Sequence, residues 1–335
     1  MTEKNSEILE KNAEFGIVAR SPGGPEVLEW TALEPAAPGP GEVRVAQRAV
    51  GVNFIDTYYR QGAYPWPTNP LIPGGEAAGV VEAVGPGAAF KVGDHVAYVL
   101  PTGAYRTHRV VAADRLVKLP DGVPFEVAAS LMLKGMTAQY LLKSTFPVQP
   151  GNTVLVHAAA GGVGLVLGQW LKALGITCIG TAGSPEKCAL ATTYGYTHVI
   201  DYRAEDFTAR VKQLTGGKGC DVVYDSVGHD TWRGSLKCLK PRGMFVCFGQ
   251  SSGAIADFKF SDLVSNGSLF ATRPSLFDYI RSREDLEARA ADLFGQVAAG
   301  HVKAHIGQRV ALRDAAQAHR DLEARHTQGA TVLLP

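Results

Sequence analysis

Cysteine is scarce in this 335-residue chain and follows no recognisable pattern. There are five cysteines, none of them precedes residue 178, and no two of them form a CxxC pair. Disulfide frameworks use even sets of cysteines, and cysteine-rich zinc sites use closely spaced pairs. Neither kind of site is favoured, and we expect reduced, mostly structural thiols.

Long apolar runs and a charge imbalance are missing as well. No stretch reaches the ~20 apolar residues that span a bilayer, and the polar N-terminus lacks the apolar core of a signal peptide. The formal net charge is +1, and the Lys and Arg residues are scattered along the chain, which gives a polyanion no electrostatic support. We expect a cytoplasmic protein that binds neither membrane nor nucleic acid. The residues before Phe15 are interpreted as a solvated extension.

The residues that are present suit two globular domains. Hydrophobic residues make up 46% and charged residues 19% of the chain, enough for buried cores. The length fits two domains of roughly 130 to 200 residues. In the first third, Gly and Pro clusters bound β-rich runs, which predict a partly closed β-barrel. The expected strands are Phe15–Ala19, Glu42–Ala49, Gly79–Val84, His95–Tyr98 and Tyr105–Val111.

After about Leu133 short apolar strands alternate with amphipathic helices. This rhythm predicts a doubly wound domain with a parallel sheet and right-handed crossovers. The expected strands lie in 153–157, 177–181, 198–201, 221–225, 244–249 and 268–272, and the expected helices are Val163–Leu174, Glu186–Tyr194, Glu205–Leu214 and Thr231–Leu239.

The C-terminal segment holds helical patterns over Arg283–Ala299 and Arg313–Arg325, followed by the apolar run ATVLL. So short a run needs a sheet to join, and the N-terminal β domain is the obvious host. We therefore predict that residues 1–136 and 277–335 form one catalytic domain. The doubly wound domain, residues 137–276, is inserted between these two parts.

The segment VLVHAAAGGVG, residues 154–164, is typical of a phosphate-binding turn between a strand and a helix. Gly161 lets the backbone approach a pyrophosphate, Gly164 lets the helix pack on the strand, and the helix N-terminus offers N–H groups. Ala159 replaces the usual first glycine, and a plain tight turn is the alternative. Because one apolar helical face comes directly after the glycines, we favour a dinucleotide-binding Rossmann domain.

The residues after the second strand of this domain predict the nucleotide. A site for NAD carries an Asp or Glu there, to bind the ribose 2′-hydroxyl. Here the segment reads GTAGS, residues 180–184, and Lys187 comes shortly after it. A small uncharged rim with a cation suits a 2′-phosphate, so NADPH is predicted over NADH. The alternative is that Lys187 is a solvated helix residue, and Glu186 is a complicating charge.

Several motifs together resemble the medium-chain dehydrogenase/reductase superfamily, and within it the NADPH:quinone oxidoreductase branch of zeta-crystallin-like proteins. The resemblance extends over nearly the whole chain from about Phe15. The motifs that carry it are GVNFIDTYYR (51–60), GGEAAGVVEAVG (74–85), KVGDHVAY (91–98), HAAAGGVG (157–164), VVYDSVG (222–228) and TQGATVLLP at the C-terminus.

This resemblance implies a chaperonin-10-like, partly closed barrel and a zinc-free active site. Where the related zinc alcohol dehydrogenases place a Cys and a His, this chain has Asn53 and Gly75, and only LPTGA (100–104) stands where their cysteine-rich lobe would lie. No metal ligands are therefore assigned. A quinone is already electrophilic, and its reduction has less need of the Lewis acid that helps alcohol oxidation.

The resemblance also implies the site residues. Asn53 and Tyr58 would lie near the nicotinamide and the acceptor, with Asn53 donating its amide to a carbonyl oxygen and Tyr58 stacking on a ring or relaying a proton. Simple packing is the alternative for Tyr58, and Asp56 is interpreted as structural. Besides Asn53, the implied cofactor contacts are Lys134, Thr137, Gly161, Gly162, Val163, Gly183, Lys187, Tyr202, Phe248, Ser251 and Arg325.

His157 and His95 tempt a catalytic assignment, but each lies at the edge of an apolar strand, where structural histidines are common. The leading hypothesis is metal-free hydride transfer from NADPH to a quinone-like small molecule. The alternatives are reduction of an enone or 2-alkenal, and an NADPH-binding structural or RNA-interacting crystallin-like protein. By resemblance we expect a homodimer that pairs through the strand near 268–272.

Overall fold

The computed structural model describes residues 14–335, so the expected N-terminal extension lies outside the described residues. The chain forms two compact units. Within the described residues, unit 1 contains 14–133 together with Ser282–Glu287 and Ile306–Pro335, and unit 2 contains Lys134–Arg281 and Ala288–His305. None of the described helices is both long and apolar enough to cross a membrane.

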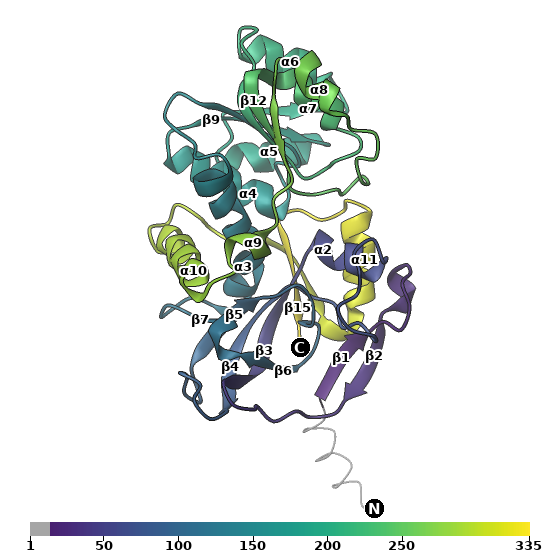
Figure 1. Cartoon of the computed structure of the whole chain (residues 1–335), viewed down its shortest axis with the longest axis vertical. Coiled ribbons are helices and arrows are strands. Elements are labelled where there is room, and N and C mark those ends of the chain that lie inside the picture. Colours follow the sequence, from purple (N-terminus) through teal and green to yellow (C-terminus); the bar gives the residue numbers. More distant parts are fainter. Residues whose placement is uncertain (1–13) are drawn as a thin grey trace, which may run out of the picture. The chain divides into compact units, whose positions relative to one another are not determined.

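Unit 1 is built mainly on antiparallel strands (Figure 1). Its main sheet has the order β14-β15-β3-β4-β5-β7, with β6 also paired to β3, and β1 and β2 form a separate pair. The strands are β1 Glu14–Val18, β2 Glu29–Leu33, β3 Glu42–Val52, β4 Glu76–Val84, β5 His95–Val99, β6 His108–Ala112, β7 Leu116–Lys118, β14 Ile306–Ala311 and β15 Ala330–Leu334. The strands expected in the first third are all present, with shifted ends.

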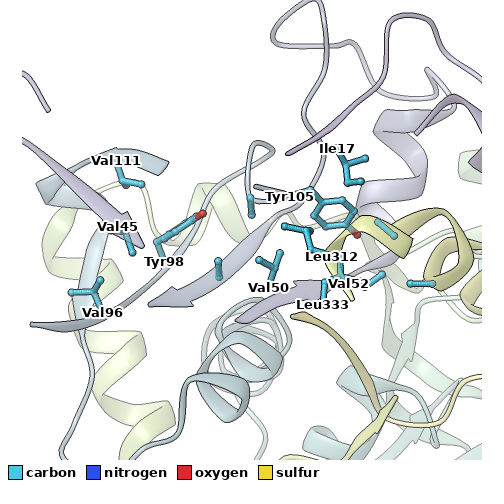
Figure 2. Packing of buried hydrophobic residues seen from close by; sticks show 14 of the residues in the cluster. Ile17, Val45, Val50, Val52, Val96, Tyr98, Tyr105, Val111, Leu312 and Leu333 are labelled. Carbon is cyan, nitrogen blue, oxygen red and sulfur yellow. The ribbon is translucent and has the colours of Figure 1, made fainter. Parts of the chain in front are cut away.

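The apolar run ATVLL joins the N-terminal sheet, as predicted from its sequence. It forms β15, which pairs antiparallel with β3 and parallel with β14. Leu333 lies opposite Val50, and both side chains belong to the buried core of unit 1, part of which Figure 2 shows. The C-terminal segment therefore completes a core that the first third of the chain begins.

Unit 2 is a doubly wound domain, as predicted. Its six strands are all parallel and have the order β10-β9-β8-β11-β12-β13. The strands are β8 Thr153–Val156, β9 Thr177–Ala182, β10 His198–Asp201, β11 Cys220–Asp225, β12 Leu239–Cys247 and β13 Phe270–Thr272. The connecting helices are α4 Gly162–Ala173, α5 Pro185–Thr193, α6 Phe207–Leu214, α7 Trp232–Cys238 and α8 Phe260–Ser265.

The remaining helices differ more from the prediction. Helices α2 Phe54–Arg60, α3 Phe125–Tyr140 and α9 Leu276–Tyr279 were not expected, whereas α10 Arg283–Ala298 and α11 Ala315–Glu323 were. All of 277–335 was predicted to form the return segment of the catalytic domain, but residues 277–281 and 288–305 belong to unit 2. The reason is packing against α3, because the end of the Leu293 side chain would lie 2.5 Å from a Cβ placed on Gly135.

Candidate active site

The turn after β8 has the geometry that a phosphate loop requires. Gly161 is the N-cap of α4 in an extended conformation, and it has no side chain to cap the first N–H groups of the helix. A Cβ on Gly164 would lie 2.3 Å from the carbonyl oxygen of Ala158 and 2.7 Å from that of Ala159, so glycine is required there. Ala158 itself has φ of 54°, which is strained for a residue with a side chain.

The candidate cofactor residues of unit 2 gather at one edge of its sheet. Gly161, Gly183, Tyr202 and Phe248 each follow the carboxyl end of a strand closely, and parallel strands place those ends together. Crevices at this edge are where open parallel sheets bind nucleotides. Ser251 is tied to the same edge, because its N–H donates to Ser226 O at 3.1 Å.

The residues predicted to line the adenosine end, Gly183, Tyr202 and the start of α5, follow the ends of the neighbouring strands β9 and β10. A Cβ on Gly183 would lie 2.4 Å from the Tyr202 hydroxyl, so the tyrosine packs directly over the glycine. Lys187 lies in the first turn of α5, and its N–H donates to Ser184 Oγ at 3.3 Å. Glu186 is satisfied locally, because hydrogen bonds from its own backbone N–H and from Ser184 lower its pKa.

A buried hydrogen-bond line links His157, which follows β8, to Asp225 at the end of β11 through Ser235. The side chain of Asp225, at the end of β11, accepts from Val227 N, Gly228 N, Thr231 Oγ1 and Ser235 Oγ at 2.8–3.0 Å. Because Ser235 donates to this carboxylate, its oxygen accepts from Nε2 of His157, 3.0 Å away. Sequence reasoning assigned no role to Asp225, although a buried strand that ends in Asp before a glycine turn is a readable signal.

His157 and His95, which were given no catalytic role from the sequence, are given none from the structure either. His157 is 1% exposed, and Nδ1 accepts from Thr181 Oγ1 at 2.8 Å. Burial lowers the pKa of His157, against an opposing effect of Asp225, so the ring is neutral and structural as expected. His95 instead lies on the surface, where its ring centroid is 4.7 Å from that of Phe125.

Two candidate cofactor residues lie on α3, one turn apart. Lys134 is 6% exposed and Thr137 is 5% exposed, and their spacing puts both on one face of the helix. Arg325 follows α11 with φ of 60°. The N–H of Arg325 donates to Leu322 O, and the N–H of His326 donates to Asp321 O. Arg325 thus ends the helix in a left-handed conformation, at a position where glycine is most common.

The candidate acceptor residues lie at the start of α2 in unit 1. Asn53 follows β3 and is the N-cap residue of α2, where its backbone N–H donates to Asp56 Oδ2 at 2.8 Å. Its Nδ2 donates to Glu76 Oε1 at 2.9 Å. Tyr58 is 8% exposed, with ring centroids 6.4 Å from Phe54 and 5.5 Å from Tyr64. Both residues are therefore held on one short helix, with Tyr58 inside an aromatic cluster.

A chain of buried polar groups fixes this helix to α11. Tyr105 donates its hydroxyl to Asp56 Oδ2 at 3.1 Å, which supports the structural interpretation of Asp56. His319 lies between Tyr105, 2.9 Å away, and Arg60, 3.0 Å away. Arg60 is 1% exposed and forms a two-point ion pair with Glu323 at 2.7 and 3.1 Å. Since Arg60 can only donate, His319 accepts at Nδ1 and donates from Nε2.

The buried position of His319 among these polar groups predicts how the stability of the protein depends on pH. Burial, helped by the Arg60 charge, lowers the pKa of His319 from 6.5 to about 3. Between these values the unfolded chain binds a proton that the folded protein does not. The contribution of neutral His319 to the free energy of unfolding is complete above pH 6.5. It falls as the pH is lowered, by at most about 1.4 kcal/mol per pH unit.

Urea unfolding from pH 8 to pH 5 measures this effect, with the His319→Asn variant for comparison. An amide can accept from Arg60 and donate to Tyr105 without titrating, so the variant should show a shallower decline of the free energy of unfolding. Parallel declines would show that His319 does not titrate as inferred. His157, which is shifted in the same direction, is present in both proteins and cancels.

The positions that correspond to zinc ligands do not fit a metal. A Cβ on Gly75 would lie 3.0 Å from Leu133 Cδ1 and 3.5 Å from Leu100 O, and Asn53 presents an amide nitrogen to Glu76. Within residues 14–335, no group of three or more His, Cys, Asp or Glu side chains could hold a metal ion. We derive no catalytic step through zinc.

The inserted nucleotide fold and the barrel-like unit together define a medium-chain dehydrogenase/reductase. The family model described as "Alcohol dehydrogenase GroES-like domain" matches residues 39–121, and that described as "Zinc-binding dehydrogenase" matches residues 162–296. The chain belongs to the quinone oxidoreductase family of this superfamily, which confirms the resemblance of its motifs.

Three relatives support this assignment. A quinone oxidoreductase of Pseudomonas aeruginosa is 54% identical over 93% of this chain and 97% of its own length. The crystal structure of Escherichia coli quinone oxidoreductase complexed with NADPH superposes with a TM-score of 0.94 at 46% identity, covering 96% of this chain and 100% of that one. A 2-haloacrylate reductase of a Burkholderia species is 45% identical over 95% of this chain and 98% of its own length.

Proposed function

We propose that this protein is a metal-free, NADPH-dependent quinone reductase. The observation that carries the proposal is the carboxyl edge of the unit 2 sheet, where a glycine turn without a side-chain cap meets an uncharged rim followed by Lys187. The family membership and the NADPH complex of the Escherichia coli relative support it. When bound, NADPH supplies a hydride with its electron pair.

The protein's own groups bind and orient the two reactants. Gly161, Gly162 and Val163 present backbone N–H groups to the pyrophosphate. Gly183 and Tyr202 line the adenosine end, and Lys187 pairs with the 2′-phosphate. The remaining proposed cofactor contacts are Asn53, Lys134, Thr137, Phe248, Ser251 and Arg325. Catalysis by these groups consists of positioning and electrostatic stabilisation.

Lys187→Ala tests the nucleotide preference. Loss of a charged hydrogen bond to the 2′-phosphate should weaken NADPH binding by about 1.5–3 kcal/mol and leave NADH binding unchanged. Fluorescence titration with each nucleotide measures both affinities. Lys172→Ala, an exposed lysine of α4, is the matched control. Equal losses for NADPH and NADH would remove Lys187 from the 2′-phosphate site.

Asn53 and Tyr58 are the proposed acceptor contacts. The Asn53 amide donates to a carbonyl oxygen of the quinone as negative charge develops there, and Tyr58 contributes an aromatic wall beside the ring. Oxidation of NADPH in the presence of a naphthoquinone tests the activity directly. The absence of turnover with quinones would contradict the proposal.

A second candidate function is reduction of an activated C=C bond. The 45% identical relative is named 2-haloacrylate reductase, so this family includes a protein named for a conjugated alkene substrate. The same amide donor would stabilise the enolate oxygen that forms when hydride adds to an enone or 2-alkenal. Parallel assays with a naphthoquinone and an enone separate the two, and activity confined to the enone would replace quinone by alkene as the acceptor.

We also propose that the protein is a homodimer. The edge strand β13 exposes all three of its residues, and Phe270 is 58%, Phe260 84% and Val264 72% exposed. An open strand edge beside exposed apolar side chains can be covered by a twofold-related copy. Sedimentation of wild type and Phe270→Asp should give a dimer and a weakened dimer, and a monomeric wild type would refute the proposed homodimer.

Because all five cysteines are free thiols, we place the protein in the cytoplasm.

A further inference from the structure

The side-chain amide of Asn53 is held by a buried carboxylate, and the Asn53 backbone is fixed at the start of α2. Its backbone N–H donates to Asp56 Oδ2 at 2.8 Å, and its backbone carbonyl oxygen accepts from the N–H of Asp56 at 3.1 Å. Nδ2 donates to Glu76 Oε1 at 2.9 Å. Only the arrangement with Nδ2 toward Glu76 gives this carboxylate oxygen a donor from Asn53.

Glu76 is built into unit 1 for this contact. It is 0% exposed on β4, directly opposite Gly51 of β3. A Cβ on Gly51 would lie 2.3 Å from Glu76 Oε1, so the glycine makes room for the carboxylate. The other oxygen, Oε2, accepts from the backbone N–H of Leu133 at 2.6 Å. The carboxylate therefore faces a fixed donor on one side and Asn53 on the other.

We propose that Glu76 is a positioning residue that sets the orientation of the Asn53 amide, so that the second N–H of Nδ2 is presented to the oxygen of the acceptor. An ionised carboxylate only accepts hydrogen bonds, so it excludes the flipped amide, which would present Oδ1 to Glu76. This inference rests on the proposed function, because it concerns the donor to the reduced carbonyl. It adds a residue that does not itself touch the acceptor.

The orientation matters because charge changes during the reaction. As hydride reaches the acceptor, an electron pair moves onto its carbonyl oxygen, which later takes a proton from solvent. A hydrogen bond donated to this oxygen becomes stronger as the negative charge grows. If the Asn53 amide were flipped, a lone pair of its own oxygen would face the charge and repel it. Misorientation should therefore reduce kcat more than nucleotide binding.

Glu76→Gln is the test substitution, because it keeps the shape but adds a donor. If the oxygen of the new amide at position 76 faces the Leu133 N–H, the nitrogen of this amide faces the Asn53 donor. If the amide is flipped, its nitrogen faces the Leu133 N–H instead. In either state two donors oppose one another. We expect kcat with the acceptor to fall about 10- to 100-fold, less than the roughly 100- to 1,000-fold for complete loss of an oxyanion donor, and the NADPH affinity to change less than twofold.

A double-mutant cycle with Asn53→Asp shows whether Glu76 acts through Asn53. N53D alone opposes two buried carboxylates, lowering Tm and removing the donor. In N53D/E76Q the amide nitrogen at position 76 donates to the carboxylate at position 53 and the amide oxygen accepts from the Leu133 N–H, so Tm should rise above that of N53D while kcat stays at the N53D level. If E76Q reduces kcat by the same factor in both backgrounds, or if the double variant melts below N53D, the proposal is overturned.

Two comparisons keep the outcomes distinct. Glu82→Gln, on the same strand but paired with Arg44 at the surface, should leave kcat unchanged. Wild-type turnover is measured with a naphthoquinone and with an enone, and if neither oxidises NADPH the proposed function fails. The Tm values of the cycle need no acceptor, so they still decide whether Glu76 orients Asn53. Retention of full kcat in E76Q with an active wild type would refute the role of Glu76.

Discussion

Replacing Asp225 with alanine is expected to lower the free energy of unfolding by about 3–5 kcal/mol, the range seen when one partner of a buried charged network is removed. Asp225 is 0% exposed, and its carboxylate satisfies two backbone N–H groups and two hydroxyls. The variant would leave Val227 N and Gly228 N without their acceptor inside the protein. Each buried donor left unsatisfied costs about 1–3 kcal/mol.

Guanidinium unfolding followed by circular dichroism measures the loss, provided that the same transition is seen by tryptophan fluorescence. Asp230→Ala is the matched control, because this carboxylate is 57% exposed and lies only five residues away. Its effect should stay within about 0.5 kcal/mol, as is usual for surface substitutions. A loss below 1 kcal/mol for Asp225→Ala would mean that water or a rearranged turn takes over the donors.

The fold could be predicted where each element carries its own local pattern. The strands and helices of unit 2 alternate at regular spacing, and β11 is buried along its whole length, which gives the apolar run that the sequence shows. Helix α2 has only seven residues, too few for a helical period to stand out from its flanks. Helix α10 was predicted, but its attachment to unit 2 depends on contacts with α3 that no local pattern records.

The candidate active site could be predicted from the sequence to the extent that it depends on glycine. Gly164 and Gly183 leave space that a Cβ would fill, and such positions are visible as glycines in the sequence. The networks that hold the site were not readable, because their members are far apart. Arg60 and His319 are 259 residues apart in the chain, and the partner of Asn53 is a glutamate 23 residues later. Only the folded sheet makes these pairs neighbours.

Gly164→Ala is expected to reduce NADPH affinity by at least tenfold. Its Cβ would lie 2.3 and 2.7 Å from two backbone carbonyl oxygens of the phosphate turn, closer than real Cβ contacts come. Backbone cannot rotate away as a flexible side chain can, so α4 and the turn must separate. The N–H groups at the start of α4 then move from the pyrophosphate position, and overpacking of this kind also costs about 1–3 kcal/mol of stability.

Gly295→Ala gives the matched control, because it makes the same substitution in a helix where nothing lies within 4 Å of the added Cβ. It should stabilise the protein by up to about 1 kcal/mol and leave NADPH affinity unchanged, since alanine favours the helix. Calorimetric titration with NADPH, at a temperature where all three proteins are folded, separates affinity from stability. If Gly164→Ala bound NADPH as wild type does, the close packing of α4 on the turn would not be what positions the pyrophosphate. If both glycine variants lost affinity equally, the effect would arise from helix rigidity rather than from contact with the loop carbonyls.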